Sequence, residues 1–117
     1  MSAIPPAKET VAGGDVTPLQ LKVMLGNNPD LLVLDVREPS ELTICRLEKS
    51  LDIPLGILPL RFEEVPKNQP VVVLCKMGGR SAQAVQFLKS KGYNNVSNLV
   101  GGIIRWIDDV NPTLKKY

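Results

Sequence analysis

The residues with the clearest chemical potential lie in one short stretch, VVVLCKMGGRS, at positions 71–81. An apolar run leads directly into Cys75, and a glycine pair follows after two intervening residues. Gly78 and Gly79 permit positive φ angles, so successive backbone N–H groups can turn inward around an anion. A helix that begins near Ser81 would point its positive dipole end to the same place. The stretch therefore predicts a cysteine held as a thiolate.

Cationic side chains and the lack of histidine sharpen this prediction. Lys76 and Arg80 flank the glycines and add positive charge. A free cysteine has a pKa of about 8.5, and a helix N-terminus with nearby cations lowers it by one to several units. The chain contains no histidine, so Cys75 must be activated without imidazole. The alternative is a structural cysteine that packs as a small apolar side chain.

Composition narrows the classes of function. The 117 residues suffice for one domain, and 44% hydrophobic with 22% charged residues is an ordinary globular balance. A net charge of +2 and few aromatic residues give no sign of a nucleic-acid surface. No apolar run approaches the roughly 20 residues of a membrane span, and no signal peptide is visible, so a cytoplasmic location without membrane contact is expected. Two cysteines without histidine predict no metal site, and no cofactor is expected.

Short apolar strands alternate with helical segments along the chain. Residues 1–14 have no periodic pattern and are expected to be a flexible tail or linker, with one domain at 15–117. Thr17 is the expected N-cap of a helix that starts at Pro18 and stops at Gly26. Strands are expected at 31–34, 51–53, 71–74 and 96–100, and helical segments at 39–46, 55–62, 81–91 and 103–110. This alternation predicts an α/β fold with a parallel sheet, whose ligands bind at the carboxyl ends of the strands.

Three motifs, in order, resemble those of the rhodanese-like sulfurtransferases. Residues 75–80, CKMGGR, resemble the six-residue active-site loop of that family. Residues 35–41, DVREPSE, resemble its D-V-R-x-x-x-E motif, and residues 101–106, GGIIRW, resemble its G-G-x-x-x-W motif. The resemblance covers residues 15–110. It implies the rhodanese-like fold, a central parallel five-stranded sheet flanked by helices on both faces.

Other segments are similar to one branch of the family. Residues 41–47, 53–55 and 111–117 resemble the rhodanese domain at the C-terminus of MoeB-like (E1-like) adenylyltransferase/sulfurtransferases. That likeness implies a ubiquitin-like sulfur carrier as partner, in molybdopterin, thiamin or thiolated-tRNA biosynthesis. The chain is read as either an excised domain or a free-standing relative. It departs from the common family pattern at Glu48 and Lys49, which stand where Pro-Gly is usual.

The resemblance implies that Cys75 is catalytic and carries sulfane sulfur as a persulfide. The donor would be thiosulfate or the persulfide of a cysteine desulfurase, and the isolated domain is expected to be a monomer. The loop that would bind the persulfide consists of Lys76, Met77, Gly78, Gly79, Arg80 and Ser81.

Further residues have supporting roles by position or by resemblance. Asp35 and Arg37 follow the predicted strand at 31–34 and approach the same sheet edge, where Arg37 is expected to pair with Glu41 and brace the turn. Arg61 stands where the family often has a pocket-lining residue, and a solvated charge is the equal alternative. Cys45 is expected to be a packing residue, with a resolving thiol as the alternative.

Two other functions remain open. A cysteine phosphatase or arsenate reductase of the related fold also holds an anion in a cysteine loop, but those enzymes resemble C-x-x-x-x-x-R. Four residues separate Cys75 from Arg80, and this tighter loop is expected to fit one sulfur atom better than a tetrahedral oxyanion. The second alternative is a non-catalytic rhodanese-like module that only docks a partner. Such modules usually lose the loop cysteine, which this chain retains.

Overall fold

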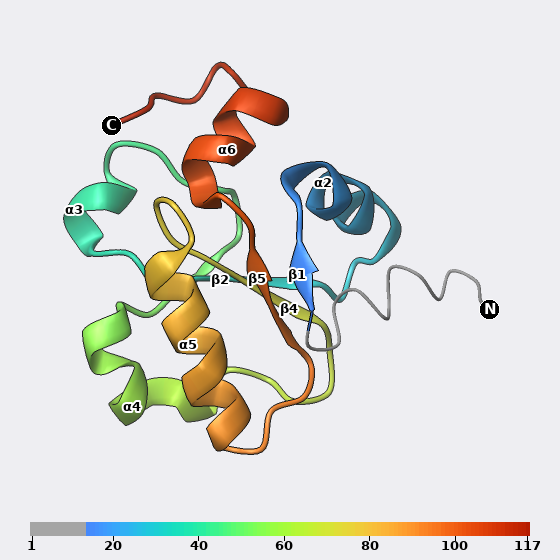
Figure 1. Cartoon of the computed structure of the whole chain (residues 1–117), viewed down its shortest axis with the longest axis vertical. Helices are drawn as coiled ribbons and strands as arrows, with labels where there is room; N and C mark the ends of the chain where they lie inside the picture. Colours follow the sequence, from blue (N-terminus) through green and yellow to red (C-terminus); the bar gives the residue numbers. More distant parts are fainter. Residues whose placement is uncertain (1–13) are drawn as a thin grey trace.

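The computed structural model describes residues 14–117, in which five parallel strands form one sheet in the order β1-β5-β4-β2-β3 (Figure 1). The strands are β1 (Asp15–Val16), β2 (Leu32–Asp35), β3 (Leu51–Asp52), β4 (Val71–Leu74) and β5 (Val96–Leu99). The helices are α2 (Pro18–Asn27), α3 (Pro39–Leu42), α4 (Leu58–Arg61), α5 (Gly79–Ser90) and α6 (Gly102–Asp109), with 3₁₀ turns η1 (Leu55–Ile57) and η2 (Phe62–Glu64) beside α4. The expected linker at 1–14 lies, except for residue 14, outside the described residues.

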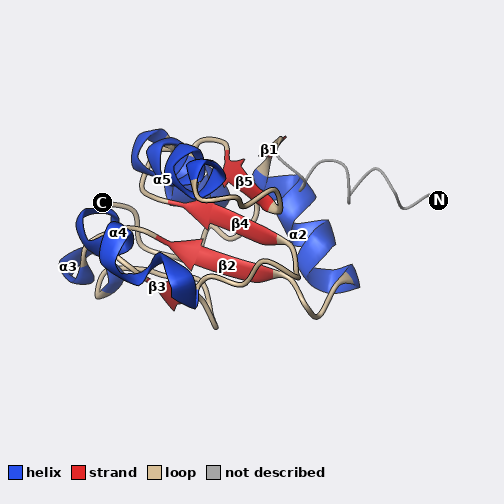
Figure 2. Cartoon of the chain, turned by 90° about the horizontal axis from the view of Figure 1, so that it is seen from below, coloured by secondary structure: helices blue, strands red, loops and turns tan. Residues whose placement is uncertain are grey.

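The central strand β4 shows how the sheet is covered on both faces (Figure 2). All four of its residues are buried, and it pairs in parallel with β2 and β5. Val71 and Val73 belong to the apolar cluster that includes α5, whereas Val72 and Leu74 belong to the cluster with α2 and α6. Because successive side chains point to opposite faces, a strand buried on both sides must be apolar throughout. Cys75 continues the alternation on the α5 face.

The parallel sheet with helices on both faces confirms the fold class expected from the sequence. Figure 1 shows α2 beside α6, and α5 beside α4 on the other side of the sheet. Among residues 14–117, no helix combines the length and the apolar character that a bilayer crossing requires.

The first helix ends later than the sequence predicts. Thr17 is its N-cap, as expected, and accepts a hydrogen bond from a backbone N–H through its side chain. The prediction that Gly26 stops the helix is wrong, because α2 continues to Asn27 and the N–H of Asn28 closes it on the carbonyl of Met24 at 2.9 Å. A glycine ends a helix through a positive φ, and the φ angle of Gly26 is not positive.

One strand and two helix boundaries also differ from the prediction. The strand β1, with two residues, is too short to show a periodic pattern and was not predicted. The helix expected at 39–46 ends at Leu42. The helix expected to begin at Ser81 begins at Gly79, because Gly78 takes the left-handed conformation with φ 110° and serves as its N-cap.

The turn where the chain departs from the family pattern is built with a left-handed lysine. Lys49 has φ 63°, and no other non-glycine residue among those described has a positive φ. Glycine is the usual residue in this conformation, since a Cβ atom there costs roughly 1–2 kcal/mol. Lys49 therefore adopts, at a cost in stability, a conformation that glycine takes without strain.

The first turn of α6 holds the backbone of the cysteine loop. The N–H groups of Ile103 and Ile104 donate to the carbonyls of Cys75 and Lys76 at 2.9 and 3.1 Å. Gly102, with φ 63°, lies against these carbonyls, and an added Cβ would be 2.6 Å from the Cys75 oxygen and closer still to Lys76. The second glycine of the G-G-x-x-x-W pattern is thus required by close contact of two backbones.

Gly102→Ala is expected to lower the free energy of unfolding by about 2 kcal/mol or more, because the new Cβ must displace the loop backbone. Gly26→Ala is the matched control, since its Cβ would meet nothing within 4 Å. Alanine there should stabilise α2 by about 0.5–1 kcal/mol. Urea unfolding followed by the fluorescence of the single tryptophan measures both variants. Equal stabilities of the two variants would contradict the packing argument.

Candidate active site

The sulfur of Cys75 lies at the junction of β4 and α5, where backbone and side-chain donors surround it. The residue is 2% exposed. Its Sγ accepts the Gly78 N–H at 3.0 Å and lies 3.4 Å from the hydroxyl of Ser81. Burial raises the pKa of Cys75, but hydrogen bonds from the Ser81 hydroxyl and from the N–H groups of Ser81, Gly78 and Met77 outweigh it and lower the pKa.

The glycine pair has two different tasks. Gly78 uses the positive φ that the sequence predicts, which turns its N–H toward the sulfur. Gly79 does not adopt a positive φ and is the first residue of the twelve-residue helix α5. The positive end of this helix dipole therefore lies beside Cys75 and favours the thiolate.

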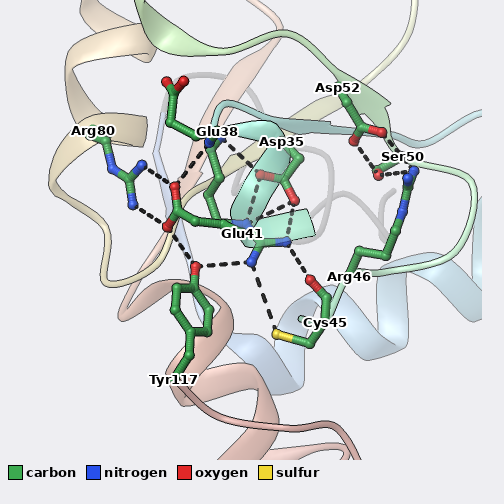
Figure 3. Close-up of polar contacts among 10 residues, drawn as sticks. Asp35, Glu38, Glu41, Cys45, Arg46, Ser50, Asp52, Arg80 and Tyr117 are labelled. Atoms are coloured by element: carbon green, nitrogen blue, oxygen red, sulfur yellow. Dashed lines mark hydrogen bonds and ion pairs between the residues drawn. The ribbon is translucent and has the colours of Figure 1, made fainter. Parts of the chain in front are cut away.

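Arg80 forms an ion pair with Glu41, which balances its charge (Figure 3). The guanidinium nitrogens Nη1 and Nη2 of Arg80 donate to the two carboxylate oxygens of Glu41 at 2.6 and 2.8 Å. This bidentate hydrogen bond lowers the pKa of Glu41 to about 2, against the opposing effect of burial. Hydrogen bonding to Glu41 raises the pKa of Arg80, and the charge of Cys75 adds a smaller part. The loop thus contains an ion pair where the sequence suggested a free cation.

The predicted pairing of Arg37 with Glu41 is wrong. Arg37 is fully buried, and its Nε and Nη2 donate to the carboxylate of Asp35 at 3.0 and 2.8 Å. Nη2 also donates to the Cys45 carbonyl at 2.8 Å. A buried guanidinium needs a buried counter-charge, and Asp35, also fully buried, supplies it. Cys45 packs in the apolar cluster with α2 and α6, as expected.

Tyr117 connects these two ion pairs, and the sequence analysis missed it. Its hydroxyl accepts a hydrogen bond from Nη1 of Arg37 at 2.9 Å and donates one to the carboxylate of Glu41 at 2.7 Å (Figure 3). Burial raises the pKa of Tyr117 to about 12, so the hydroxyl stays protonated near neutral pH. The ring also lies 4.6 Å from the Lys76 ammonium, a cation–π contact. The only signal in the sequence was the family-like ending at 111–117.

The side chains of three candidate residues face solvent or have partners other than the Cys75 sulfur. Met77 is 69% exposed, so its side chain faces solvent while its N–H contributes to the sulfur site. The ammonium of Lys76 contacts the ring of Tyr117. Arg61 forms an ion pair with Glu64, three residues along the chain, at 2.7 Å, and both side chains are exposed. Of the two readings of Arg61, the described contacts correspond to the solvated charge.

Asn98 is a second residue that the sequence analysis missed. It lies in β5, opposite Val73 of β4, and therefore close to the end of the strand that carries Cys75. Its Oδ1 accepts the Ser81 hydroxyl at 2.5 Å. An asparagine in a short strand carries no sequence signal that would have pointed to this contact.

Comparisons with known proteins agree with this geometry. Residues 17–109 match the family described as Rhodanese-like domain. A protein named sulfurtransferase from Allochromatium vinosum is 40% identical over 86 residues, which cover 74% of this chain and 80% of that protein. The probable adenylyltransferase/sulfurtransferase MoeZ of Mycobacterium tuberculosis is 29% identical over 113 residues, which cover 95% of this chain and only 29% of that protein.

A solved structure has the same fold. The crystal structure of a rhodanese-related protein from Thermoplasma volcanium superposes with a TM-score of 0.77 and 33% sequence identity. The match covers 84% of this chain and 94% of that protein.

Tyr117→Phe is expected to lower the free energy of unfolding by about 1–3 kcal/mol, because a donor of the buried Arg37 loses its oxygen acceptor and Oε2 of Glu41 loses one of its two donors. Lys76→Met is the control, since it removes the cation over the ring and leaves the hydroxyl contacts in place. Urea unfolding measures both. A Phe variant as stable as the wild type would show that Tyr117 does not brace the two ion pairs.

Glu41→Gln and Arg80→Ala are expected to move the pKa of Cys75 in opposite directions, by about 0.5 unit or more. The first substitution leaves the charge of Arg80 unbalanced and should lower the pKa of Cys75. The second leaves a carboxylate unbalanced and should raise it. The pH dependence of iodoacetamide alkylation, measured in a Cys45→Ser background, reports the pKa of this thiol. A shift in the same direction for both variants would contradict the balanced-pair interpretation.

Proposed function

Because the chain belongs to the rhodanese-like domain family, we propose that it is a sulfurtransferase in which Cys75 carries sulfane sulfur as a persulfide. The observation that carries the proposal is the position of the Cys75 sulfur. It accepts the Gly78 N–H at 3.0 Å, beside the N-terminus of α5, and its pKa is lowered. These donors stabilise a sulfur anion without a histidine.

The first half-reaction loads the sulfur. A lone pair of the Cys75 thiolate attacks the sulfane sulfur of thiosulfate, and a bond forms between Sγ and that sulfur. The bond between the two sulfur atoms of thiosulfate breaks, and its electron pair leaves with sulfite. With a cysteine desulfurase persulfide as donor, the leaving group is the thiolate of the donor cysteine. The product in both cases is the anion Cys75-S-S⁻.

The second half-reaction unloads it. An acceptor nucleophile attacks the terminal sulfur, the bond to Sγ breaks, and its electron pair restores the Cys75 thiolate. The persulfide anion needs the same N–H donors as the thiolate, so the loop of residues 75–81 would serve both steps. Cyanide and dithiothreitol are suitable small acceptors for an assay.

The small exposure of Cys75 supports transfer of a single atom. With the residue 2% exposed at the base of a six-residue loop, a terminal sulfur can approach Sγ, whereas a phosphoryl group must also place three equatorial oxygens. The retained cysteine and its lowered pKa argue against a module that only docks a partner.

The remaining residues have supporting roles in this proposal. Ser81 and Gly78 contact the sulfur, Arg80 is positioned by Glu41, and the Asp35–Arg37 pair braces the turn beneath them; Arg61 has no part in the site. As natural acceptor we propose a ubiquitin-like sulfur carrier, which the resemblance of residues 41–47, 53–55 and 111–117 implies; the similarity to an adenylyltransferase/sulfurtransferase agrees with that branch of the family. We also propose that the isolated domain is a monomer and that it acts in the cytoplasm, where thiols are kept reduced.

Incubated with thiosulfate, the wild-type chain is expected to gain the mass of one sulfur atom on Cys75 and to lose it to cyanide or dithiothreitol. Intact-mass and peptide mass spectrometry measure both steps. Cys75→Ser should gain nothing, and the matched control Cys45→Ser should gain one sulfur as the wild type does, because Cys45 lies outside the loop. Circular dichroism verifies that both variants are folded.

Two results would contradict the proposal. One is a wild-type chain that hydrolyses aryl phosphates while Cys75 stays unmodified by thiosulfate, which would favour the phosphatase alternative. The other is a folded Cys45→Ser variant that no longer accepts sulfur, which would require a second catalytic thiol.

A further inference from the structure

The hydroxyl proton of Ser81 has two competing acceptors. Ser81 is fully buried, and its Oγ lies 3.4 Å from Cys75 Sγ and 2.5 Å from Asn98 Oδ1. A serine hydroxyl has one proton to donate and can accept further hydrogen bonds. It therefore cannot donate to the sulfur and to the amide oxygen at the same time. The amide oxygen of Asn98 carries no proton, so its 2.5 Å contact with Oγ requires the Ser81 proton to lie toward Asn98.

A second contact sets the orientation of the Asn98 amide. Its Nδ2 donates to the carbonyl of Gly78, the residue whose N–H binds the sulfur, at 3.4 Å. The reversed amide would place Oδ1 against this carbonyl oxygen, and two acceptors would then face each other. The amide oxygen consequently faces Ser81, where it can only accept a hydrogen bond.

We propose that Asn98 is a positioning residue that holds the Ser81 hydroxyl proton away from Cys75. The inference rests on the proposed use of Cys75 as a thiolate nucleophile. In the thiol form, the S–H of Cys75 donates to Ser81 Oγ while the Ser81 hydroxyl donates to Asn98. In the thiolate form, Ser81 can donate to the sulfur only if it breaks its hydrogen bond to Asn98. The amide oxygen of Asn98 then loses its donor. Asn98 thus stabilises the thiol relative to the thiolate.

This effect opposes the backbone donors of the loop. The N–H of Gly78 stabilises the thiolate, and the Ser81–Asn98 pair limits how far the thiolate is favoured. A resting thiol is less prone to alkylation and oxidation than a thiolate, so the pair protects Cys75 between turnovers.

Substitution of Asn98 changes no charge, which separates this effect from those of the ion pairs around the sulfur. Lys76, adjacent in the loop, lies over the ring of Tyr117. The paired charges on the elements around the cysteine are Arg80 of α5 with Glu41 of α3, Arg37 with Asp35 beside β2, and Arg105 with Asp109 of α6.

Asn98→Leu, made in a Cys45→Ser background, removes the amide at similar volume and frees the Ser81 hydroxyl. The alkylation pKa of Cys75 should fall by about 0.5–1 unit, which is about a three- to tenfold gain in thiolate well below the pKa. Ser81→Ala should give a higher pKa than Asn98→Leu, because the sulfur then has no hydroxyl that could donate to it. The double variant should behave as Ser81→Ala, since Asn98 acts only through the hydroxyl.

Asn98→Ala is the second variant, used if near-ultraviolet circular dichroism shows that the leucine disturbs the fold. An unchanged or raised pKa of Cys75 in the folded Asn98 variants overturns the inference, as does a double variant that differs from Ser81→Ala.

Sulfur uptake from thiosulfate by the wild type is measured in parallel. A wild type that takes up no sulfur, with a lowered pKa in Asn98→Leu, refutes the proposed function and leaves this inference standing. Sulfur uptake by the wild type, with an unchanged pKa of Cys75 in Asn98→Leu, supports the proposed function and refutes this inference.

Discussion

The structure around Cys75 depends on one constraint, the balance between the burial of its sulfur and the hydrogen bonds that the sulfur accepts. Burial alone raises the pKa of Cys75, so donors must more than offset the loss of water. The chain provides them from the backbone, through the left-handed Gly78 and the first turn of α5. The carbonyls of the same loop are in turn held by α6, which approaches closely because Gly102 has no side chain. Main-chain groups of the loop and of α5 thus reach the sulfur, and those of α6 hold the loop in place.

The charged side chains act on this loop mainly as braces. Arg80 is neutralised by Glu41 and Arg37 by Asp35, while the Lys76 ammonium lies over the ring of Tyr117. Tyr117 joins the two pairs through its hydroxyl. Backbone donors have fixed positions, whereas free cations would exert a field that salt screens. The thiolate is therefore stabilised by geometry more than by net charge.

Neutral side chains add a finer level of control. Ser81 can donate to the sulfur or accept from it, and Asn98 biases that choice by binding the hydroxyl. In the function that we propose, the site holds a thiol at rest, a thiolate for attack and a persulfide after loading, and a partner that can reverse its hydrogen bond suits all three. A fixed cation in the place of Ser81 would favour the anions alone.

The sequence by itself determined the parallel sheet, the buried strand β4, the N-cap of α2 and the position of Cys75 before a helix, because these depend on apolar runs, glycines and caps that are close together in the chain. Motifs likewise indicated the family. Only the tertiary structure decided which carboxylate pairs with Arg37. It also decided that Tyr117, 76 positions from Glu41, and Asn98, 17 positions from Ser81, reach the site. The partner of a polar side chain is whatever group the packed elements bring within hydrogen-bond distance, and no local pattern records that encounter.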